Sequence, residues 1–267
     1  MNETVLVTGA SSGIGFEIAS YLSSKGYKVY GASRTAPASD NFFPIKIDVT
    51  NQESVDIGIN QIISKEGKID ILINNAGVGS AGAVEKTPID DIKKSFEVNL
   101  FGVVRLCQAV LPHMRKQKYG KIINMSTLGS MLGLPFRGFY SGSKGAMDLM
   151  TESLRLEVER FGIQACTIHP GEVRTNIGAH RIISIEKDDK VYGDAIEKAF
   201  NELDSSVAHG KDPKLFGPYI ERIILSKKVK RNYYIGTFNE LLGVKLKKFL
   251  PYYIYEKIIR AYFKADD

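Results

Sequence analysis

The sequence predicts an α/β fold in which one parallel sheet, doubly wound, carries helices on both of its faces. Short runs rich in β-branched and aromatic residues alternate with segments of helix length through most of the chain. The run from Ile69 to Ile73 is almost wholly apolar, as expected of a strand that helices cover from both sides. These two features predict a Rossmann-type architecture with about seven strands.

The strands follow one another along the chain, and most are separated by a segment long enough for a helix. The expected strands are VLVT (5–8), KVYGAS (28–33), FPIKIDV (43–49), IDILIN (69–74), KIINMS (121–126), QACTIHP (164–170) and a late RNYYIG (231–236).

The chain is expected to form a single domain. Its 267 residues and 43% hydrophobic content suit one large α/β unit, so we assign residues 1–267 to a single Rossmann-type domain. The strand-helix alternation weakens after residue 170, and residues 176–231 show the irregular and helical patterns of a substrate lid. Residues 236–267 are expected to form a helical C-terminal extension, with Pro251 separating two short helices.

Three features of the sequence indicate the cellular compartment: the cysteines, the N-terminus and the hydropathy. Cys107 and Cys166 each lie in an apolar stretch, which favours buried free thiols over a disulfide. The N-terminus lacks the pattern of a secretory signal, and no run reaches the roughly 18 apolar residues of a membrane-spanning helix. We therefore expect a cytoplasmic protein.

The basic charge is concentrated near the C-terminus. Residues 221–267 contain 11 Lys and Arg against 5 Asp and Glu, whereas the formal charge of the whole chain is +6. Such an excess is most often a solvated helix face, so nucleic acid is not an expected partner. The mixture of aromatic, aliphatic and basic residues in this tail suits a lid or packing element first, a subunit interface second and an anionic membrane last.

A glycine-rich turn follows the first strand directly and opens a helical pattern that Gly26 is expected to end. Glycines let the backbone approach a pyrophosphate, whose charge is stabilised by free N–H groups at a helix N-terminus. The spacing G-x-x-x-G-x-G differs from the G-x-G-x-x-G of the better-known dinucleotide fingerprint. The candidate cofactor-binding residues of this turn are Gly9, Ser11, Ser12, Gly13, Ile14 and Gly15.

The segment TGASSGIG (8–15) resembles the signature of the classical short-chain dehydrogenase/reductase family, and the resemblance extends from Val5 to about Thr175. It implies a nicotinamide cofactor and hydride transfer between that cofactor and a carbonyl or alcohol. Ser33 occupies the position where NAD-preferring relatives carry Asp, and Arg34 is placed to pair with a 2′-phosphate through its forked guanidinium. The resemblance therefore implies NADP(H) in preference to NAD(H).

Three further segments match cofactor-contacting motifs of that family, each at the end of an expected strand. One resembles an adenine-contacting pair, one resembles the N-N-A-G motif, and one resembles the P-G-x-V-x-T segment that holds the carboxamide and phosphate. Their candidate binding residues are Asp48, Val49, Asn75, Ala76, Gly77, Pro170, Gly171, Val173 and Thr175.

The candidate reacting group is a tyrosine at the start of a helical pattern. Tyr140 and Lys144 are spaced to share one helix face, and both also belong to the implied cofactor contacts. A nearby ammonium favours the phenolate, so Tyr140 is a plausible general acid/base. Thr127 is the preferred hydroxyl to polarise the substrate oxygen, with Ser126 in reserve, and Asn99 matches the family asparagine that links the lysine to solvent.

The substrate is expected to be a lipophilic ketone, aldehyde or alcohol of steroid or retinoid type. The segment 128–139, the loop after Gly77 and the region beyond Asn176 are expected to line the pocket, and their Leu, Met and Phe residues are apolar. The histidines show no metal-ligand spacing, so no metal is expected.

The same motifs are also compatible with two other functions. One is a catalytically silent NADP(H)-binding regulator, and the other is a related epimerase or dehydratase. The resemblance also implies a homo-oligomer, a dimer or tetramer, paired through residues 101–118 and 140–161.

Overall fold

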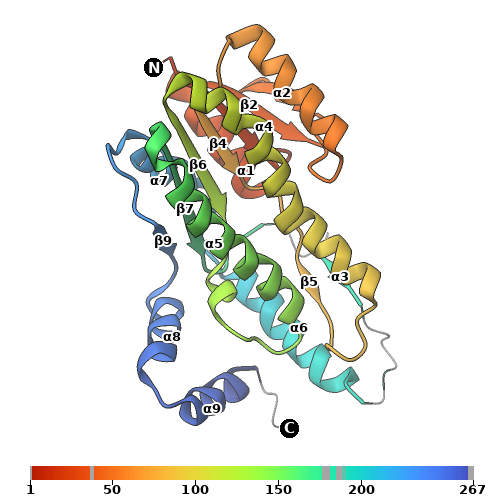
Figure 1. Ribbon diagram of the computed structural model, residues 1–267. Coiled ribbons are helices and arrows are strands. Elements are labelled where there is room, and N and C mark those ends of the chain that lie inside the picture. Colours follow the sequence, from red (N-terminus) through yellow and green to blue (C-terminus); the bar gives the residue numbers. More distant parts are fainter. Residues whose placement is uncertain (1, 37–38, 176–180, 185–188, 190, 264–267) are drawn as a thin grey trace.

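The computed structural model describes residues 2–36, 39–175, 181–184, 189 and 191–263. Its centre is a seven-stranded sheet with the order β3-β2-β1-β4-β6-β7-β9, in which every neighbouring pair is parallel (Figure 1). The predicted sheet is thereby confirmed. The strands are β1 Thr4–Thr8, β2 Lys28–Ser33, β3 Phe43–Lys46, β4 Ile71–Asn74, β6 Gly120–Met125, β7 Ile163–Pro170 and β9 Asn232–Ile235.

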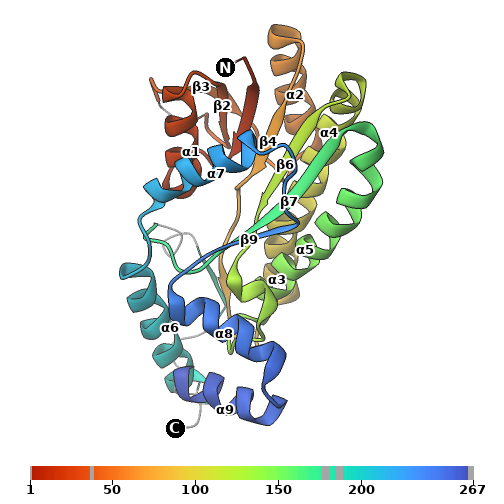
Figure 2. The ribbon, with the colours of Figure 1, turned by 90° about the vertical axis from the view of Figure 1, so that its left-hand side faces the viewer.

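The sheet separates two apolar clusters, which explains why its central strands are apolar on both faces. In β1, Leu6 belongs to one cluster, whereas Val5 and Val7 belong to the other, because successive side chains of a strand point to opposite faces. Helices α2 Gln52–Glu66, α4 Gly102–Gln117 and α5 Gly138–Val158 cover the first face, and α1 Gly13–Ser24 covers the second (Figure 2). The fold is doubly wound, as predicted.

Part of the expected lid belongs to the core instead. Residues 216–225 form α7 (Phe216–Leu225), which packs beside α1, and Phe216 and Ile220 are completely buried with Ile18 and Leu22. Within the region 176–231, helix α6 (Gly193–Ala208) and Arg181 contribute to the lining of the cavity described below. Residues 176–180, 185–188 and 190 of this expected lid lie outside the described residues.

A second, two-stranded sheet was not predicted. Strand β5 (Ser80–Ala81), in the loop after β4, pairs in parallel with β8 (Ile182–Ile183). Strands of two residues are too short to show an alternating pattern, so the sequence gives no signal for them. The pairing fixes one rim of the site to the segment that follows β7.

The third strand is shorter than expected. Strand β3 ends at Lys46, three residues before the predicted end at Val49. Asp48 Oδ1 accepts hydrogen bonds from Thr50 N at 2.9 Å and from Thr50 Oγ1 at 2.7 Å, so the chain turns here. Asn51 then caps α2 by accepting a hydrogen bond from Ser54 N.

Helices α3 (Ile89–Phe96) and α4 are joined by a π-helical turn over Glu97–Phe101, so one continuous helical rod runs from residue 89 to residue 117. Gly102 follows the turn, and a Cβ there would come within 2.9 Å of Val49, so the rod lies tightly against the end of β3. A π turn is rare and is often found at functional sites.

The C-terminal extension is helical, as predicted, and consists of α8 (Phe238–Phe249) and α9 (Tyr252–Phe263). Helix α8 begins with a capping box in which Thr237 and Glu240 satisfy each other's backbone groups. In both views the two helices extend from the end of the body where α6 lies (Figures 1 and 2). None of the helices in the described ranges is long and apolar enough to cross a membrane.

The two cysteines are free and buried, as the sequence predicts. Burial raises the pKa of Cys107 and of Cys166 to about 12, so neither thiol is reactive at neutral pH.

Candidate active site

The glycine turn requires its glycines for both conformation and space. Gly9 and Gly13 adopt φ values of +68° and +58°, which side chains rarely tolerate. A Cβ at Gly9 would come within 2.9 Å of Ala76 Cα, and a Cβ at Gly15 would collide with the carbonyl oxygen of Gly9. The result is a bare backbone turn at the carboxyl end of β1, where α1 begins. Ser11 and Ser12 are exposed beside it, and Ile14 lines the cavity.

Asn75 joins the end of β4 to this turn. Its Nδ2 donates to the carbonyl oxygens of Thr8 at 3.0 Å and Gly9 at 3.3 Å. The hydroxyl of Thr8 accepts in return from the backbone N–H groups of Asn75 and Ala76, each at 3.1 Å. The N-N-A-G segment therefore positions the glycine turn, a function that the sequence prediction of cofactor contact did not include.

At the end of β2, Ser33 and Arg34 are placed differently. The Oγ atom of Ser33 is buried and has no hydrogen-bond partner among the described residues, whereas Arg34 is exposed. A buried hydroxyl without a partner is costly unless a ligand or water completes it. Asp48 is half-buried and Val49 is buried, one strand further along the sheet.

The segment after β7 is fixed from three directions. Gly171 N donates to Ile235 O at 2.7 Å, Glu172 N donates to Glu240 Oε1 at 2.7 Å, and Val173 forms a parallel bridge with Lys211. Pro170 is buried, and Thr175 approaches the glycine turn, since a Cβ on Gly13 would lie 3.2 Å from the Thr175 methyl. The structure thus brings the P-G-x-V-x-T segment beside the glycine turn. The contact with Glu240 comes from α8, in the C-terminal tail that the sequence analysis ranked first as a lid or packing element.

Asn99 lies in the π turn and is fully buried. Its Oδ1 accepts from Val78 N at 2.9 Å, and its Nδ2 donates to Val78 O at 2.9 Å and to Ser143 Oγ at 3.1 Å. One side chain therefore ties the loop after β4 to α5. A Cβ on Gly77 would lie 3.2 Å from Asn99 Oδ1 and 3.3 Å from Lys144 Nζ, so these groups meet around that glycine.

Tyr140 lies in the first turn of α5 and is 8% exposed. Burial is the largest influence on its phenol and raises its pKa, while the Arg137 guanidinium and the Thr127 hydroxyl lower it. The guanidinium carbon of Arg137 lies 5.0 Å from the centre of the tyrosine ring. Burial therefore raises the pKa of the phenol in this structure, whereas the sequence analysis expected a nearby ammonium to favour the phenolate.

Lys144 is buried, 4% exposed, one turn after Tyr140. Its Nζ donates to Met125 O at 2.8 Å. Burial lowers the pKa of Lys144 to about 8, and the charge of Asp148, a further turn along α5, opposes this shift. The ammonium is therefore held in a poorly solvated position where a small change in charge alters its protonation.

The two candidate hydroxyls are separated by the structure. The Thr127 hydroxyl lies beside the Tyr140 phenol and lowers its pKa, and it also accepts from Gly129 N at 3.2 Å. Ser126 Oγ is buried without a hydrogen-bond partner in the described structure, and it lies near enough to Asp148 to lower the pKa of that carboxyl. This placement favours Thr127 as the hydroxyl that meets a substrate.

Behind the site lies Asp148, a half-buried acid that the sequence analysis missed. Asp148 Oδ2 is 3.7 Å from His169 Nδ1, and burial raises the pKa of Asp148 while His169 lowers it. His169 is 2% exposed and stacks on Tyr234 with ring centres 5.1 Å apart. The i, i+4 spacing of Lys144 and Asp148 was the available sequence signal, since it places both on one face of α5.

These groups surround a cavity with a volume of about 120 Å³. Its apolar lining includes Val78, Met125, Leu203 and Val207, and its charged lining comes from residues that the sequence analysis did not single out: Arg137, Glu172 and Arg181. Of the expected segment 128–139, Arg137 lines this cavity, so the segment contributes a charge here rather than apolar contacts. Leu128 and Gly129 are buried in a 3₁₀ turn over Leu128–Met131.

Of the charged side chains in the lining, Arg137, Glu172 and Arg181 are in ion pairs. Arg137 lies 3.3 Å from Glu172, and Arg181 lies 3.3 Å from Asp204. Arg137 is three residues before Tyr140, so helix periodicity could have placed it near the site. Arg181 and Leu203 reach the cavity through tertiary folding and have no sequence signal of this kind.

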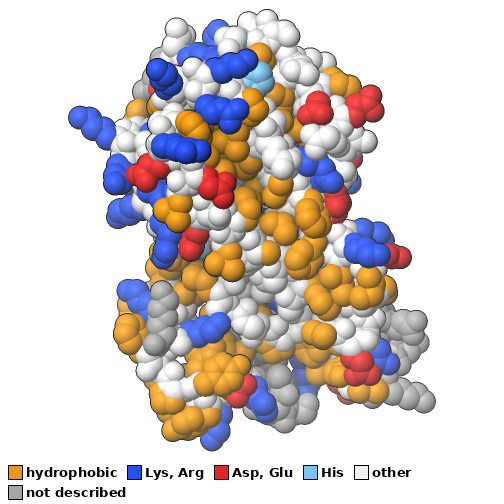
Figure 3. Space-filling view, viewed as in Figure 1, with side chains coloured by type: hydrophobic (Ala, Val, Ile, Leu, Met, Phe, Trp, Pro, Cys, Tyr) orange, Lys and Arg blue, Asp and Glu red, His pale blue; other side chains and the backbone are white. Residues whose placement is uncertain are grey.

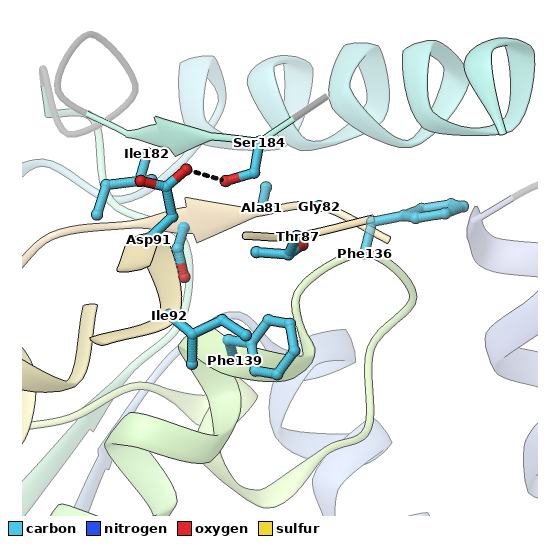
Figure 4. A pocket seen from close by; sticks show the side chains of 10 residues that line it. Ala81, Gly82, Thr87, Asp91, Ile92, Phe136, Phe139, Ile182 and Ser184 are labelled. Atoms are coloured by element: carbon cyan, nitrogen blue, oxygen red, sulfur yellow. Dashed lines mark hydrogen bonds between the residues drawn. The ribbon is translucent and has the colours of Figure 1, made fainter. Parts of the chain in front are cut away.

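A second cavity between β5, β8 and the loop before α5 is too small for an organic ligand. Its volume is about 10 Å³, which is about the space of one water molecule (Figure 4). The Asp91 carboxylate accepts a hydrogen bond from Ser184 Oγ at 2.9 Å along its edge. Phe136 and Phe139 line this space, so these expected substrate-binding aromatics help to pack the small sheet instead.

The residues present suit a dinucleotide. The glycine turn presents bare backbone at the N-terminus of α1, packed against Asn75 and Ala76, and the unpartnered Ser33 Oγ lies at the end of the adjacent strand. The cavity with Tyr140 and Lys144 lies at the same carboxyl edge of the sheet, where ligands bind in open α/β folds. The cradle and the cavity share Ile14, Asn75 and Thr175 in their linings, so one extended ligand can reach both.

Comparisons with known proteins agree with this arrangement. Residues 3–183 match the family model described as short chain dehydrogenase. The chain is 37% identical over 265 residues, 98% of each sequence, to the 3-ketodihydrosphingosine reductase of Bacteroides thetaiotaomicron. It is 35% identical over 260 residues, 96% of each, to a probable short-chain type dehydrogenase/reductase of Helicobacter pylori.

The fold is also similar to a solved structure. A short-chain dehydrogenase from Streptomyces avermitilis superposes with a TM-score of 0.84 at 29% identity, covering 97% of this chain and 98% of the other. The sequence matches and the sheet order agree on one assignment. The chain belongs to the short-chain dehydrogenase/reductase family, and it is an NAD(P)-dependent oxidoreductase.

Proposed function

We propose that this protein is an NADPH-preferring reductase of a ketone that carries a long hydrocarbon chain and a polar end. The observation that carries the proposal is the buried phenol of Tyr140, which lies beside the Thr127 hydroxyl at the wall of the cavity. A neutral phenol is ready to donate a proton, which is the role that carbonyl reduction requires. Bound nicotinamide supplies the hydride.

Four residues of the chain bind, protonate or position the reacting groups. The Thr127 hydroxyl donates a hydrogen bond to the carbonyl oxygen, and Tyr140 passes its proton to that oxygen as negative charge develops. Lys144, held by Met125 O, supplies a positive charge near the phenol and holds the ribose hydroxyls. Asn99 keeps the loop after β4 against α5, so that these groups stay in register. Oxidation reverses both transfers.

The substrate class rests on the mixed lining of the cavity and on one relative. Met125, Leu203 and Val207 offer apolar contacts, while Arg137 and Glu172 offer charges of both signs for a polar end. The relative from Bacteroides thetaiotaomicron, similar over 98% of both chains, is named as a reductase of 3-ketodihydrosphingosine. That compound is therefore the first substrate to test.

The test follows NADPH absorbance with 3-ketodihydrosphingosine, a simple long-chain ketone and a short ketone. We expect turnover that decreases in this order, because the short ketone forgoes both the apolar and the polar contacts. A cofactor that binds without turnover of any ketone or alcohol would favour a silent regulator. Substrate conversion without net change in the cofactor would favour an epimerase or dehydratase.

The cofactor preference is tested by the variant Ser33→Asp. An aspartate at the end of β2 accepts hydrogen bonds from a ribose 2′-hydroxyl and repels a 2′-phosphate. We expect the ratio of kcat/KM for NADPH to that for NADH to fall by about 100-fold or more, equivalent to about 3 kcal/mol. Arg34→Ala should weaken NADPH and leave NADH nearly unchanged. A wild-type protein that already prefers NADH would overturn the proposal.

We also infer that the protein forms a homo-oligomer through α4 and α5. Leu149 and Leu156 on α5 are 70% and 76% exposed and lie on one face of the helix, since they are seven residues apart. Phe101, just before α4, is 49% exposed. These side chains support pairing of the two helices with a second copy.

A further inference from the structure

The C-terminal helices expose large apolar side chains. Phe238 is 78%, Phe249 81%, Tyr252 70%, Tyr253 64% and Leu242 38% exposed. We call these five residues the C-terminal face. On α8, Phe238, Leu242 and Phe249 are spaced by four and seven residues, so they form one stripe along the helix. Hydrophobic side chains gather over α8 and α9 in the lower left of the surface view (Figure 3).

This exposure is not needed to fold the helices. Val244 of α8 and Tyr255 of α9 are 8% and 5% exposed, so each helix already buries an inner side. Helix α8 lies against the 3₁₀ turn at 128–131, and α9 lies against α6. The C-terminal face is therefore an outer surface on helices that are already docked to the body.

Cations are interspersed with these aromatic side chains. Between residues 238 and 260 the sequence has five Lys and Arg against two Glu. Lys245 is exposed and lies on the stripe of α8 between Leu242 and Phe249, and Lys257 is exposed one turn after Tyr253. One of the two acids, Glu240, is occupied by the capping box and by the backbone of Glu172. With five cations against two acids, the formal charge of this segment is positive.

A bilayer with anionic lipids fits this combination better than a protein does. Tyrosine and phenylalanine rings are favourable at the boundary between lipid headgroups and acyl chains, and neighbouring Lys side chains pair with lipid phosphates. Protein interfaces, in contrast, are depleted of lysine at their cores. Both helices have 12 residues, a length that suits helices lying in the plane of a membrane surface.

The position of the surface adds a reason for such contact. Helix α6, against which α9 packs, supplies Leu203 and Val207 to the lining of the cavity. A lipid-like molecule leaving a bilayer at the C-terminal face would meet α6 next.

We propose that α8 and α9 form a peripheral docking surface for an anionic phospholipid bilayer, with the C-terminal face at the headgroup boundary and Lys245 and Lys257 on lipid phosphates. The value of this docking for catalysis rests on the proposed function, because it would deliver a lipophilic ketone to the cavity. The binding itself does not depend on the substrate. The sequence analysis ranked membrane contact last, and the outward aromatic side chains of the structure are what changes that order.

The test is sedimentation of the full-length protein with vesicles of phosphatidylcholine alone or with about one third phosphatidylglycerol. We expect the bound fraction to be at least about fivefold larger with the anionic lipid and to fall as salt is raised from about 0.1 M to about 0.5 M. Equal binding to both vesicles, or none to either, would overturn the proposal.

Two double variants test whether the residues of the C-terminal face are responsible for vesicle binding. Phe249→Ser combined with Tyr253→Ser should reduce binding about tenfold, because interfacial affinity follows the buried apolar area. The matched control combines Phe43→Ser with Ile57→Ser, which are 45% and 51% exposed on β3 and α2, and it should bind vesicles as the wild type does. If the C-terminal variant binds as well as the control, the assignment is wrong.

Two readouts separate this proposal from its alternatives. The mass of each variant in solution is measured without lipid, and a change confined to the C-terminal variant would identify a second copy as the occupant and overturn bilayer docking. Cofactor oxidation with a soluble ketone is measured in parallel. Vesicle binding without ketone turnover would contradict the proposed function alone, whereas turnover without vesicle binding would contradict the docking surface alone.

Discussion

Replacing Tyr140 by Phe is expected to lower kcat for ketone reduction by about 1,000-fold or more, with little change in the affinity for the cofactor. The substitution removes the only atom of this side chain that can donate a proton and keeps the ring that packs near Arg137. Because the side chain is 8% exposed and its ring is retained, the fold should be unaffected.

Thr127 provides the companion variants. Thr127→Val should lower kcat by about 10- to 100-fold, because the hydrogen bond to the carbonyl oxygen is lost while the shape is kept. Ser126→Ala is the matched control and should have a small effect, since Ser126 lies toward Asp148. Turnover that survives in Tyr140→Phe, or a larger loss in Ser126→Ala than in Thr127→Val, would contradict the assignment. Steady-state rates with saturating cofactor measure both.

Replacing Lys144 by Met is expected to inactivate the enzyme and to stabilise the protein at neutral pH. Burial lowers the pKa of Lys144 from 10.5 to about 8, so folding at pH 7 must keep a proton on a poorly solvated amine. This opposes folding by about 3 kcal/mol, at 1.4 kcal/mol for each pKa unit. The hydrogen bond to Met125 O returns about 1 kcal/mol.

The free energy of unfolding of Lys144→Met at pH 7 should therefore exceed that of the wild type by about 2 kcal/mol. The midpoint of thermal unfolding should rise by about 4 °C. The sign depends on pH. Between pH 8 and 10.5 the unfolded chain binds more protons than the folded one, so the stability of the wild type rises with pH over this window. The stability difference between the wild type and Lys144→Met should thus be largest below pH 8 and disappear above pH 10.5. Thermal unfolding at pH 7 and pH 10 measures this, and a variant that is less stable at pH 7 would contradict the argument.

The sequence predicted the parts of the protein that depend on local patterns. The apolar strands, the glycine turn and the spacing of Tyr140 and Lys144 are all visible within short windows, and the structure places them at one edge of the sheet. The sequence analysis preferred Thr127 over Ser126 only by its family position, because the two residues are adjacent and their side-chain surroundings are set by the fold.

The remaining features depend on contacts between distant segments. Glu240 reaches the backbone of Glu172 across 68 positions, and Arg181 joins Leu203 in the cavity wall. No periodicity links such pairs. Helix α7 was assigned to the lid because its neighbours in sequence are irregular, although its apolar face is what completes the core beside α1. Burial of that face was decided by tertiary packing rather than by the local pattern.

The π turn between α3 and α4 also determines which side of α3 faces α5. A π turn is equivalent to one extra residue within an α-helix, and here the Gly102 N–H donates to Glu97 O, five positions back. Each residue advances a helix by about 100°, so the insertion rotates everything before it relative to everything after it. Without the extra residue, α3 would present a different side to α5. Alignments with relatives that keep an unbroken α-helix should therefore show a single-residue gap near Asn99.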